Sequence, residues 1–143
     1  MRTRAREYAL QALFFMDIRK RMSSDMIDCF AETFEPSARS VPYFRTLAQG
    51  VIDQQSVIDP LIDRHSSNWR LRRMAYVDRN ALRIAVYELL SRPDVPFKVA
   101  INEAINLGKK FGTEASGAFI NGILDSIRIA LEAGEVGSPD PPK

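Results

Sequence analysis

Apolar residues recur at intervals of three and four along almost the whole chain, and this spacing constrains the fold more than any other feature of the sequence. Such spacing gathers apolar side chains on one face of an α-helix, whereas a half-buried strand would need strict alternation. No segment shows a convincing alternation of that kind. The sequence therefore predicts an all-α protein of about seven helices.

Residues that favour helix ends divide the chain into these helices. Short polar side chains are good N-caps, because they accept hydrogen bonds from the free N–H groups of the first turn. Proline suits a first turn but interrupts a helix further along. The N-caps expected on this basis are Thr3, Asp78 and Thr113, and further helices are expected to start at Ser24 and Pro42. We expect a kink or a restart at Pro60, capped by Asp59. The helices are expected to stop at Pro36, Pro93, Gly112 and Gly134.

A chain of 143 residues is long enough for one domain or two small packed halves. The helical pattern weakens over residues 64–77, so we expect a single domain over 1–134 with subdomains of roughly 1–64 and 65–134. The last segment, 135–143, holds three prolines and almost nothing to bury, which predicts a disordered tail.

Charge is unevenly distributed although the net charge is only +2. Residues 1–21 carry six Lys/Arg and two acids, and residues 64–83 carry six and one. Residues 22–63 are acidic, with two Lys/Arg against seven Asp/Glu. Two basic blocks favour local contacts with anions such as a phosphate backbone, although two solvated faces would give the same pattern.

Several classes of chemistry lack their motifs. No glycine pattern marks a phosphate-binding loop, and one histidine with one cysteine builds no His/Cys metal site, so we expect neither cofactor nor metal nor enzymatic activity. Glu88 and Glu103 lie within apolar helices, where a carboxylate can be a general acid or base but more often pairs with an arginine, and Arg83 is one candidate partner. The single Cys29 has apolar neighbours and is interpreted as a buried, inert thiol in a reducing compartment.

Membrane insertion is not expected either. The longest uncharged run, residues 115–124, is far shorter than the about 20 apolar residues of a spanning helix, and no signal peptide follows the basic start. We therefore expect a cytoplasmic protein.

Three stretches together resemble the NusB family in order and spacing. They begin with RTRAREYALQALF from Arg2, VDRNALRIAVYEL from Val77, and VPFKVAINEAI from Val95 continuing to FINGILD at Asp125. The resemblance covers the chain from Arg2 to about residue 130. It implies an all-helical fold and a transcription antitermination factor that binds boxA-type RNA in nascent ribosomal RNA leaders. It also implies the ribosomal protein NusE as a partner, and a larger complex on RNA polymerase.

The resemblance also implies where RNA is bound. Arg2, Arg4 and Arg6 alternate at the start of the first helix, where free N–H groups and the helix dipole also favour phosphate. Gln11 and Phe14 follow further along that helix and offer an amide and a stacking face. The family pattern adds the start of the last helix, here Ser116 and Phe119, although Phe119 fits a core position equally well.

Contacts with the protein partner are implied near the start of the helix at residue 78, through Asp78 and Arg79. An ordinary cap and a solvated arginine explain these two residues equally well. Asn102, Asn121 and Gly122 are interpreted as structural, with amides satisfying buried groups and a glycine at a close helix approach. The alternative function is a protein-binding or self-associating helical module, for example a homodimer, that does not bind RNA.

Overall fold

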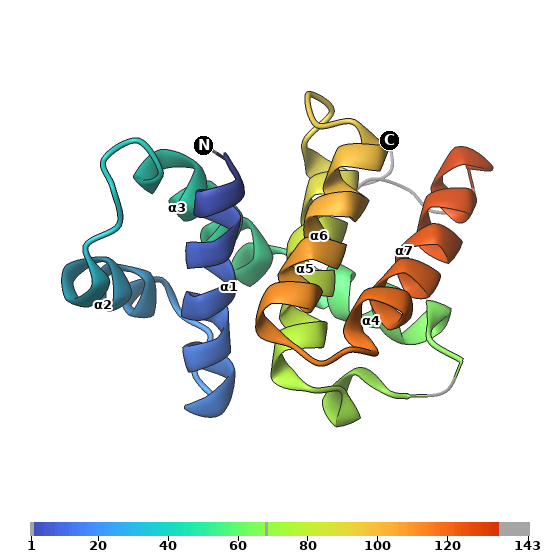
Figure 1. Ribbon diagram of the computed structural model, residues 1–143, viewed down its shortest axis with the longest axis horizontal. Helices are drawn as coiled ribbons and strands as arrows, with labels where there is room; N and C mark the ends of the chain where they lie inside the picture. The colour runs from blue at the N-terminus through green and yellow to red at the C-terminus, as the bar shows by residue number, and fades with distance from the viewer. Residues whose placement is uncertain (1, 68, 135–143) are drawn as a thin grey trace.

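The computed structural model describes residues 2–67 and 69–134, and within these ranges the chain is all-helical (Figure 1). It contains no strand in the described ranges, which confirms the expected fold class. None of the described helices is both long and apolar enough to cross a membrane. The elements are α1 (Arg2–Ile18), α2 (Ser24–Phe34), α3 (Val41–Asp53), α4 (Gln55–His65), a 3-10 turn η1 (Leu71–Arg73), α5 (Tyr76–Ser91), α6 (Phe97–Phe111) and α7 (Ser116–Glu132).

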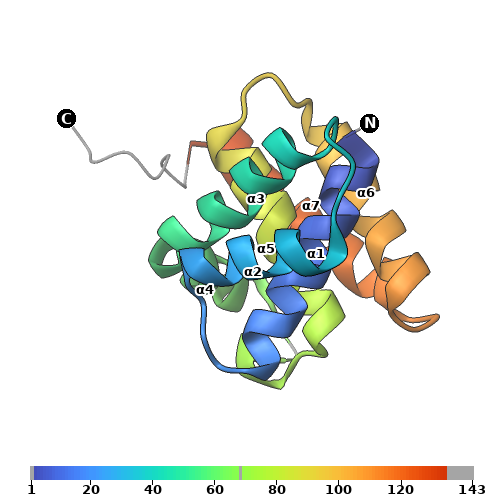
Figure 2. The same cartoon turned by 90° about the vertical axis from the view of Figure 1, so that its left-hand side faces the viewer.

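The helices form two groups around one continuous core. Helices α1–α3 lie on one side and α4–α7 on the other, with α1 and α5 in contact between them (Figures 1 and 2). Helix α4 packs more extensively against α5 and α7 than against α3. This packing places the boundary between the groups near residue 54, earlier than the division at residue 64 expected from the sequence.

Helix α1 occupies the centre because one of its faces is lined with small residues. Ala5, Ala9 and Ala12 are fully or almost fully buried, and so are Leu13 and Met16, as the spacing predicts. The alanines permit α3, α5 and α6 to approach the helix closely. The buried stripe leaves the opposite face of α1 for contacts outside the core.

Three expected N-caps are wrong. Helix α1 already includes Thr3, whose hydroxyl donates to Glu103 across the fold at 2.7 Å. Helix α5 begins at Tyr76, so Asp78 lies within its first turn. Helix α7 begins at Ser116, and the Thr113 N–H donates to the Ser116 hydroxyl at 3.0 Å. For Thr3 and Thr113, a tertiary or neighbouring contact uses a polar group of the residue that sequence alone assigns to the helix end.

The break near Pro60 is also displaced. Helices α3 and α4 meet at Gln54, and Pro60 lies inside α4. Asp59 does not cap a helix; both of its carboxylate oxygens accept hydrogen bonds from Arg83 of α5. The other stops are close to expectation, with Glu35 in a left-handed conformation before Pro36, and Gly112 directly after α6.

Four residues expected to be buried or to serve packing are exposed. Cys29 is exposed on α2, contrary to the prediction of a buried thiol. Asn102, Asn121 and Gly122 are exposed as well, and a Cβ on Gly122 would meet no atom within 4 Å. The close helix approach occurs instead at Gly50, where a Cβ would lie 2.2 Å from the Tyr87 ring. Gly50 thus permits α3 to rest against α5.

Candidate nucleic-acid interface

Two arginines at the start of α1 remain accessible. Arg2 donates to Asp94 at 3.0 Å and stacks over the Tyr43 ring, and its side chain is 43% exposed. Arg4 contacts Glu7 and Tyr8 and is 62% exposed. Surface pairs of this kind are weak and easily exchanged. Both guanidinium groups are therefore available to an incoming phosphate.

Arg6 is enclosed, so the structure does not support its predicted role as an RNA contact. Its side chain is only 4% exposed. Its Nε and Nη2 donate to Glu88 at 2.8–3.1 Å, and its Nη1 donates to Glu103 at 2.8 Å. The predicted arginine partner of these two carboxylates is therefore Arg6 and not Arg83. Burial opposes the charge on Arg6, but the hydrogen bonds and charge of Glu88 outweigh it and raise the pKa of the guanidinium.

The same network reaches α3. The Tyr43 hydroxyl donates to Glu88 beside the Arg6 guanidinium. Burial and the bond to the Glu88 carboxylate both raise the pKa of Tyr43. Glu88 thus joins three helices and is completely enclosed, which suits a structural ion pair and not a proton donor in an open site.

Gln11 and Phe14 lie on the face of α1 that remains outside the core. Both are partly buried and line a hollow of about 340 Å³ together with Phe111 of α6. Phe14 contacts the Tyr76 ring edge-on at 5.8 Å between centroids. The structure therefore brings the predicted amide and aromatic ring together in one shallow hollow.

Lys110 of α6 is a further cation at this face that the sequence reasoning missed. Its ammonium donates to Glu7 of α1 at 2.9 Å, and its side chain is 55% exposed. Helices α1 and α6 are in contact (Figure 1), and Lys110 and Arg4 both pair with Glu7. The only signal in the sequence is a pair of lysines at the end of a helix, which is a common pattern.

At the start of α7, the two predicted residues have different positions. Ser116 is 1% exposed and its hydroxyl accepts from the Thr113 N–H, so the structure does not support the prediction that it contacts RNA. Phe119 is partly buried and lines a hollow of about 280 Å³ with Trp69. Phe119 remains a candidate for stacking, and Trp69 joins it from a loop that the sequence reasoning did not select.

The two residues predicted to contact the protein partner, Arg79 and Asp78, also differ in how far the fold encloses them. Arg79 is largely enclosed: its Nε and Nη2 donate to Asp17 at 2.7–2.8 Å, and its Nη1 donates to the carbonyls of Leu71 and Arg72. A guanidinium with all these internal bonds is not free for a partner, so the structure does not support a direct partner contact by Arg79. Asp78 is partly exposed, and its buried Oδ1 has no hydrogen-bond partner in the described part of the chain.

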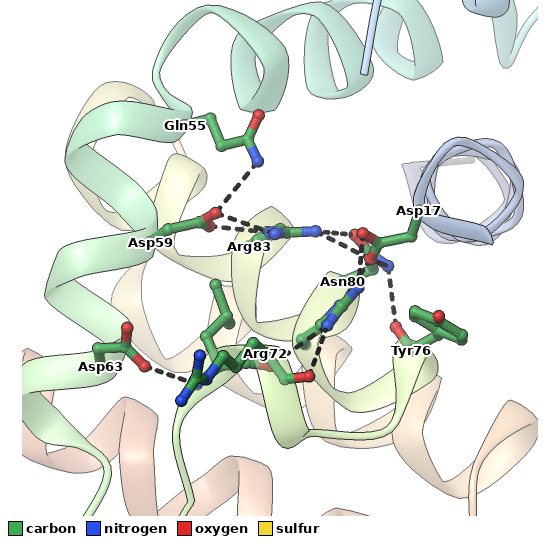
Figure 3. Close-up of polar contacts among 10 residues, drawn as sticks. Asp17, Gln55, Asp59, Asp63, Arg72, Tyr76, Asn80 and Arg83 are labelled. Atoms are coloured by element: carbon green, nitrogen blue, oxygen red, sulfur yellow. Dashed lines mark hydrogen bonds and ion pairs between the residues drawn. The ribbon is translucent and has the colours of Figure 1, made fainter. Parts of the chain in front are cut away.

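Asp17 is the centre of a second buried network, which Figure 3 shows. Besides Arg79, it accepts from Asn80 at 2.7 Å and from Arg83 at 3.0 Å. Arg83 lies between Asp17 of α1 and Asp59 of α4. Burial alone would raise the pKa of Asp17, but these donors lower it. The two networks therefore fix both ends of α1 against α5 and hold its outer face in place.

Other chemistry is not assembled in the described residues. No group of three or more His, Cys, Asp or Glu side chains there is arranged to hold a metal ion. His65, which resembled no catalytic motif, contacts the Ser126 hydroxyl at 2.8 Å. What the structure does assemble is a face of exposed cations and aromatic rings along α1, α6 and the start of α7.

The chain is similar to known proteins over almost all of its length. The model of the NusB family matches residues 3–128. The transcription antitermination protein NusB of Desulfatibacillum aliphaticivorans is 54% identical over 91% of each chain, and that of Myxococcus xanthus is 45% identical over 91% of this chain and 96% of its own.

Solved structures of NusB proteins are similar to this chain as well. Thermotoga maritima NusB has a TM-score of 0.81 at 38% identity, covering 95% of this chain and 98% of its own. A structure of the antitermination factors NusB and NusE in complex with dsRNA has a TM-score of 0.80 at 28% identity, covering 90% and 96%.

Proposed function

Because this chain belongs to the NusB family, we propose that it is a transcription antitermination factor that binds boxA-type RNA together with NusE. The RNA would lie in nascent ribosomal RNA leaders, and the pair would join a larger complex on RNA polymerase in the cytoplasm. The protein would act by holding its partners, without catalysis. The observation that carries the proposal is the family match over residues 3–128, combined with exposed cations at the start of α1.

The proposed RNA face runs along α1 and α6. Arg2, Arg4 and Lys110 would contact phosphates, because the side chain of each is 43–62% exposed. Gln11 and Phe14 would follow, with an amide for a base edge and a ring for stacking. Single-stranded RNA is commonly held by this combination of cations and planar side chains.

The proposed NusE face lies near the start of α5. Asp78 is partly exposed and makes no ion pair in the described part of the chain, so its carboxylate would be open to a cationic side chain of the partner. Arg79 would serve this face indirectly, by holding the turn before α5 in place. Free protein would be able to cover the same exposed faces by forming a homodimer.

Fluorescence anisotropy with a labelled boxA RNA, with and without NusE, tests this proposal. We expect the double variant Arg2→Ala/Arg4→Ala to bind RNA at least tenfold more weakly and to lower the salt slope by about 1.4, since about 0.7 is expected per lost phosphate contact on a single strand. Arg128→Ala is the control, because Arg128 is 30% exposed and, like Arg4, pairs with a carboxylate three residues away. Equal binding by the double variant and this control would refute the assignment.

The alternative function is a protein-binding module that does not bind RNA, and one surface favours it. Phe15 and Phe34 are 40% and 47% exposed and stack beside a hollow of about 610 Å³ between α1 and α2. Exposed apolar rings of this kind are typical of protein contacts. NusE binding without any RNA binding, at modest salt, would support this alternative.

A further inference from the structure

Four arginines, at the end of α4 and in the segment between α4 and α5, have no acidic partner within the described ranges of the chain. They are Arg64, Arg70, Arg72 and Arg73, and all four are exposed. Two carboxylates of α4 are occupied, since Asp63 accepts the Leu71 N–H at 2.6 Å and Asp59 accepts from Arg83. Asp78 lines a hollow with Arg73 but forms no ion pair with it, so the arginines outnumber the free carboxylates here. This segment therefore presents uncompensated positive charge.

The backbone that carries these arginines is held from both sides. Asp63 of α4 binds the Leu71 N–H, and Arg79 of α5 donates to the carbonyls of Leu71 and Arg72. The Ser66 hydroxyl donates to the Trp69 carbonyl. An anchored backbone presents its side chains with a smaller ordering cost on binding than a loose loop would.

Trp69 lies within this basic segment and is 53% exposed. It lines the hollow of about 280 Å³ with Arg73 and with Phe119, one of the RNA contacts expected at the start of α7. Asp78 also lines this hollow. Its carboxylate, which the proposed function assigns to NusE, would repel a phosphate in this hollow. The hollow therefore suits a base, and the arginines beside it suit phosphates.

We propose that this surface, made by Trp69, Arg70, Arg72, Arg73 and Phe119, binds the single-stranded RNA that flanks boxA. The strand leaves the α1–α6 face at the start of α7, places a base between Trp69 and Phe119, and continues along the η1 arginines. The inference rests on the proposed function, because it extends the same RNA beyond the family-based site. Exposed aromatic rings combined with cations favour nucleic acid over an acidic protein, since bases stack on the rings while phosphates meet the guanidinium groups.

The experiment uses the full chain with NusE and three RNAs. One contains boxA alone, and the other two carry six additional unstructured nucleotides at the 5′ or the 3′ end. Trp69 is the single tryptophan of the chain, so its fluorescence reports directly on this surface once that of any tryptophan in NusE is subtracted. We expect one of the flanked RNAs, but not boxA alone, to quench this fluorescence and to bind more tightly.

Variants separate this surface from the boxA site. Trp69→Ala should weaken binding of the flanked RNA about tenfold or more and leave boxA alone unchanged, while Trp69→Phe should restore most of the loss. Arg72→Ala/Arg73→Ala should lower the salt slope for the flanked RNA by about 1.4. Arg19→Ala is the control, because Arg19 is also exposed and without a side-chain partner in the described residues but lines the hollow between α1 and α2.

The outcomes are distinct. If boxA RNA binds but neither flank changes the fluorescence or the affinity, this inference is overturned and the proposed function stands. Quenching by NusE in the absence of RNA would assign the surface to protein and would overturn it as well. If no RNA binds even with NusE, both the inference and the proposed function fail.

Discussion

Replacing Arg6 with alanine should unfold the protein more easily without acting directly on RNA. The change leaves Glu88, which is 1% exposed, without the guanidinium that donates three hydrogen bonds to it. Removing one member of a buried ion pair costs about 3–5 kcal/mol, and the Tyr43 hydroxyl still donates to Glu88, so we expect about 3 kcal/mol. At roughly 3 °C per kcal/mol for a chain of this size, Tm should fall by about 10 °C.

Thermal unfolding followed by circular dichroism gives the Tm of three variants, and anisotropy gives their RNA affinity at 10 °C. Arg4→Ala should keep the native Tm and lose RNA affinity, because its guanidinium is exposed. Arg6→Ala should have a lower Tm and keep its RNA affinity. Arg6→Lys should also have a lower Tm, because an ammonium cannot reproduce the forked hydrogen bonds to Glu88 and Glu103. The reasoning is refuted if Arg6→Ala keeps its Tm, or if it is folded at 10 °C and still loses RNA binding as strongly as Arg4→Ala does.

Three further predictions concern stability and exposure. The pKa of Asp17 is lower in the folded state than in the unfolded chain, so its contribution to the free energy of unfolding is complete above about pH 5 and is lost as pH falls through the folded value. In urea unfolding, the stability of Asp17→Asn should therefore depend less on pH below about pH 5 than that of the native protein. An equal pH dependence of the two proteins would contradict this. Gly50→Ala should destabilise the protein by about 1–3 kcal/mol in the same urea assay, because its Cβ would overlap the Tyr87 ring. Gly122→Ala should stabilise it by about 0.5–1 kcal/mol, because a Cβ there meets no other atom. Equal effects of the two substitutions would be inconsistent with the packing. Cys29 should react with a thiol reagent in the native protein nearly as fast as in urea, and strong native protection would show that it is buried after all.

The fold was predictable because helical spacing is a local property that tertiary contacts here reinforce. The stripe from Ala5 to Met16 is buried as predicted. Helix starts were less predictable, since a residue such as Thr3 is a good cap by its local chemistry but donates to Glu103, 100 residues later. The position of such a distant partner is not encoded in the neighbouring residues.

The candidate site was predictable only as a region. Arg2, Arg4 and Arg6 are equivalent in the sequence, but they point in different directions around a helix, and only Arg6 faces α5 and α6. Ser116 is similarly a polar residue near a helix start whose hydroxyl is used internally. Which polar groups remain free depends on which ones the fold consumes, and that requires the contacts of all seven helices.

The long-range pairing of Arg6 has a consequence for the synthesis of the chain. Its two carboxylate partners lie 82 and 97 residues later, so α1 leaves the ribosome well before they exist. At roughly 5–20 residues per second, this interval is about 5–20 s. During it, Arg6 is as open to solvent and to nascent RNA as Arg2 and Arg4 are. The arrival of α5 and α6 then withdraws it, so residues made late in translation select which cations of the first helix stay at the surface.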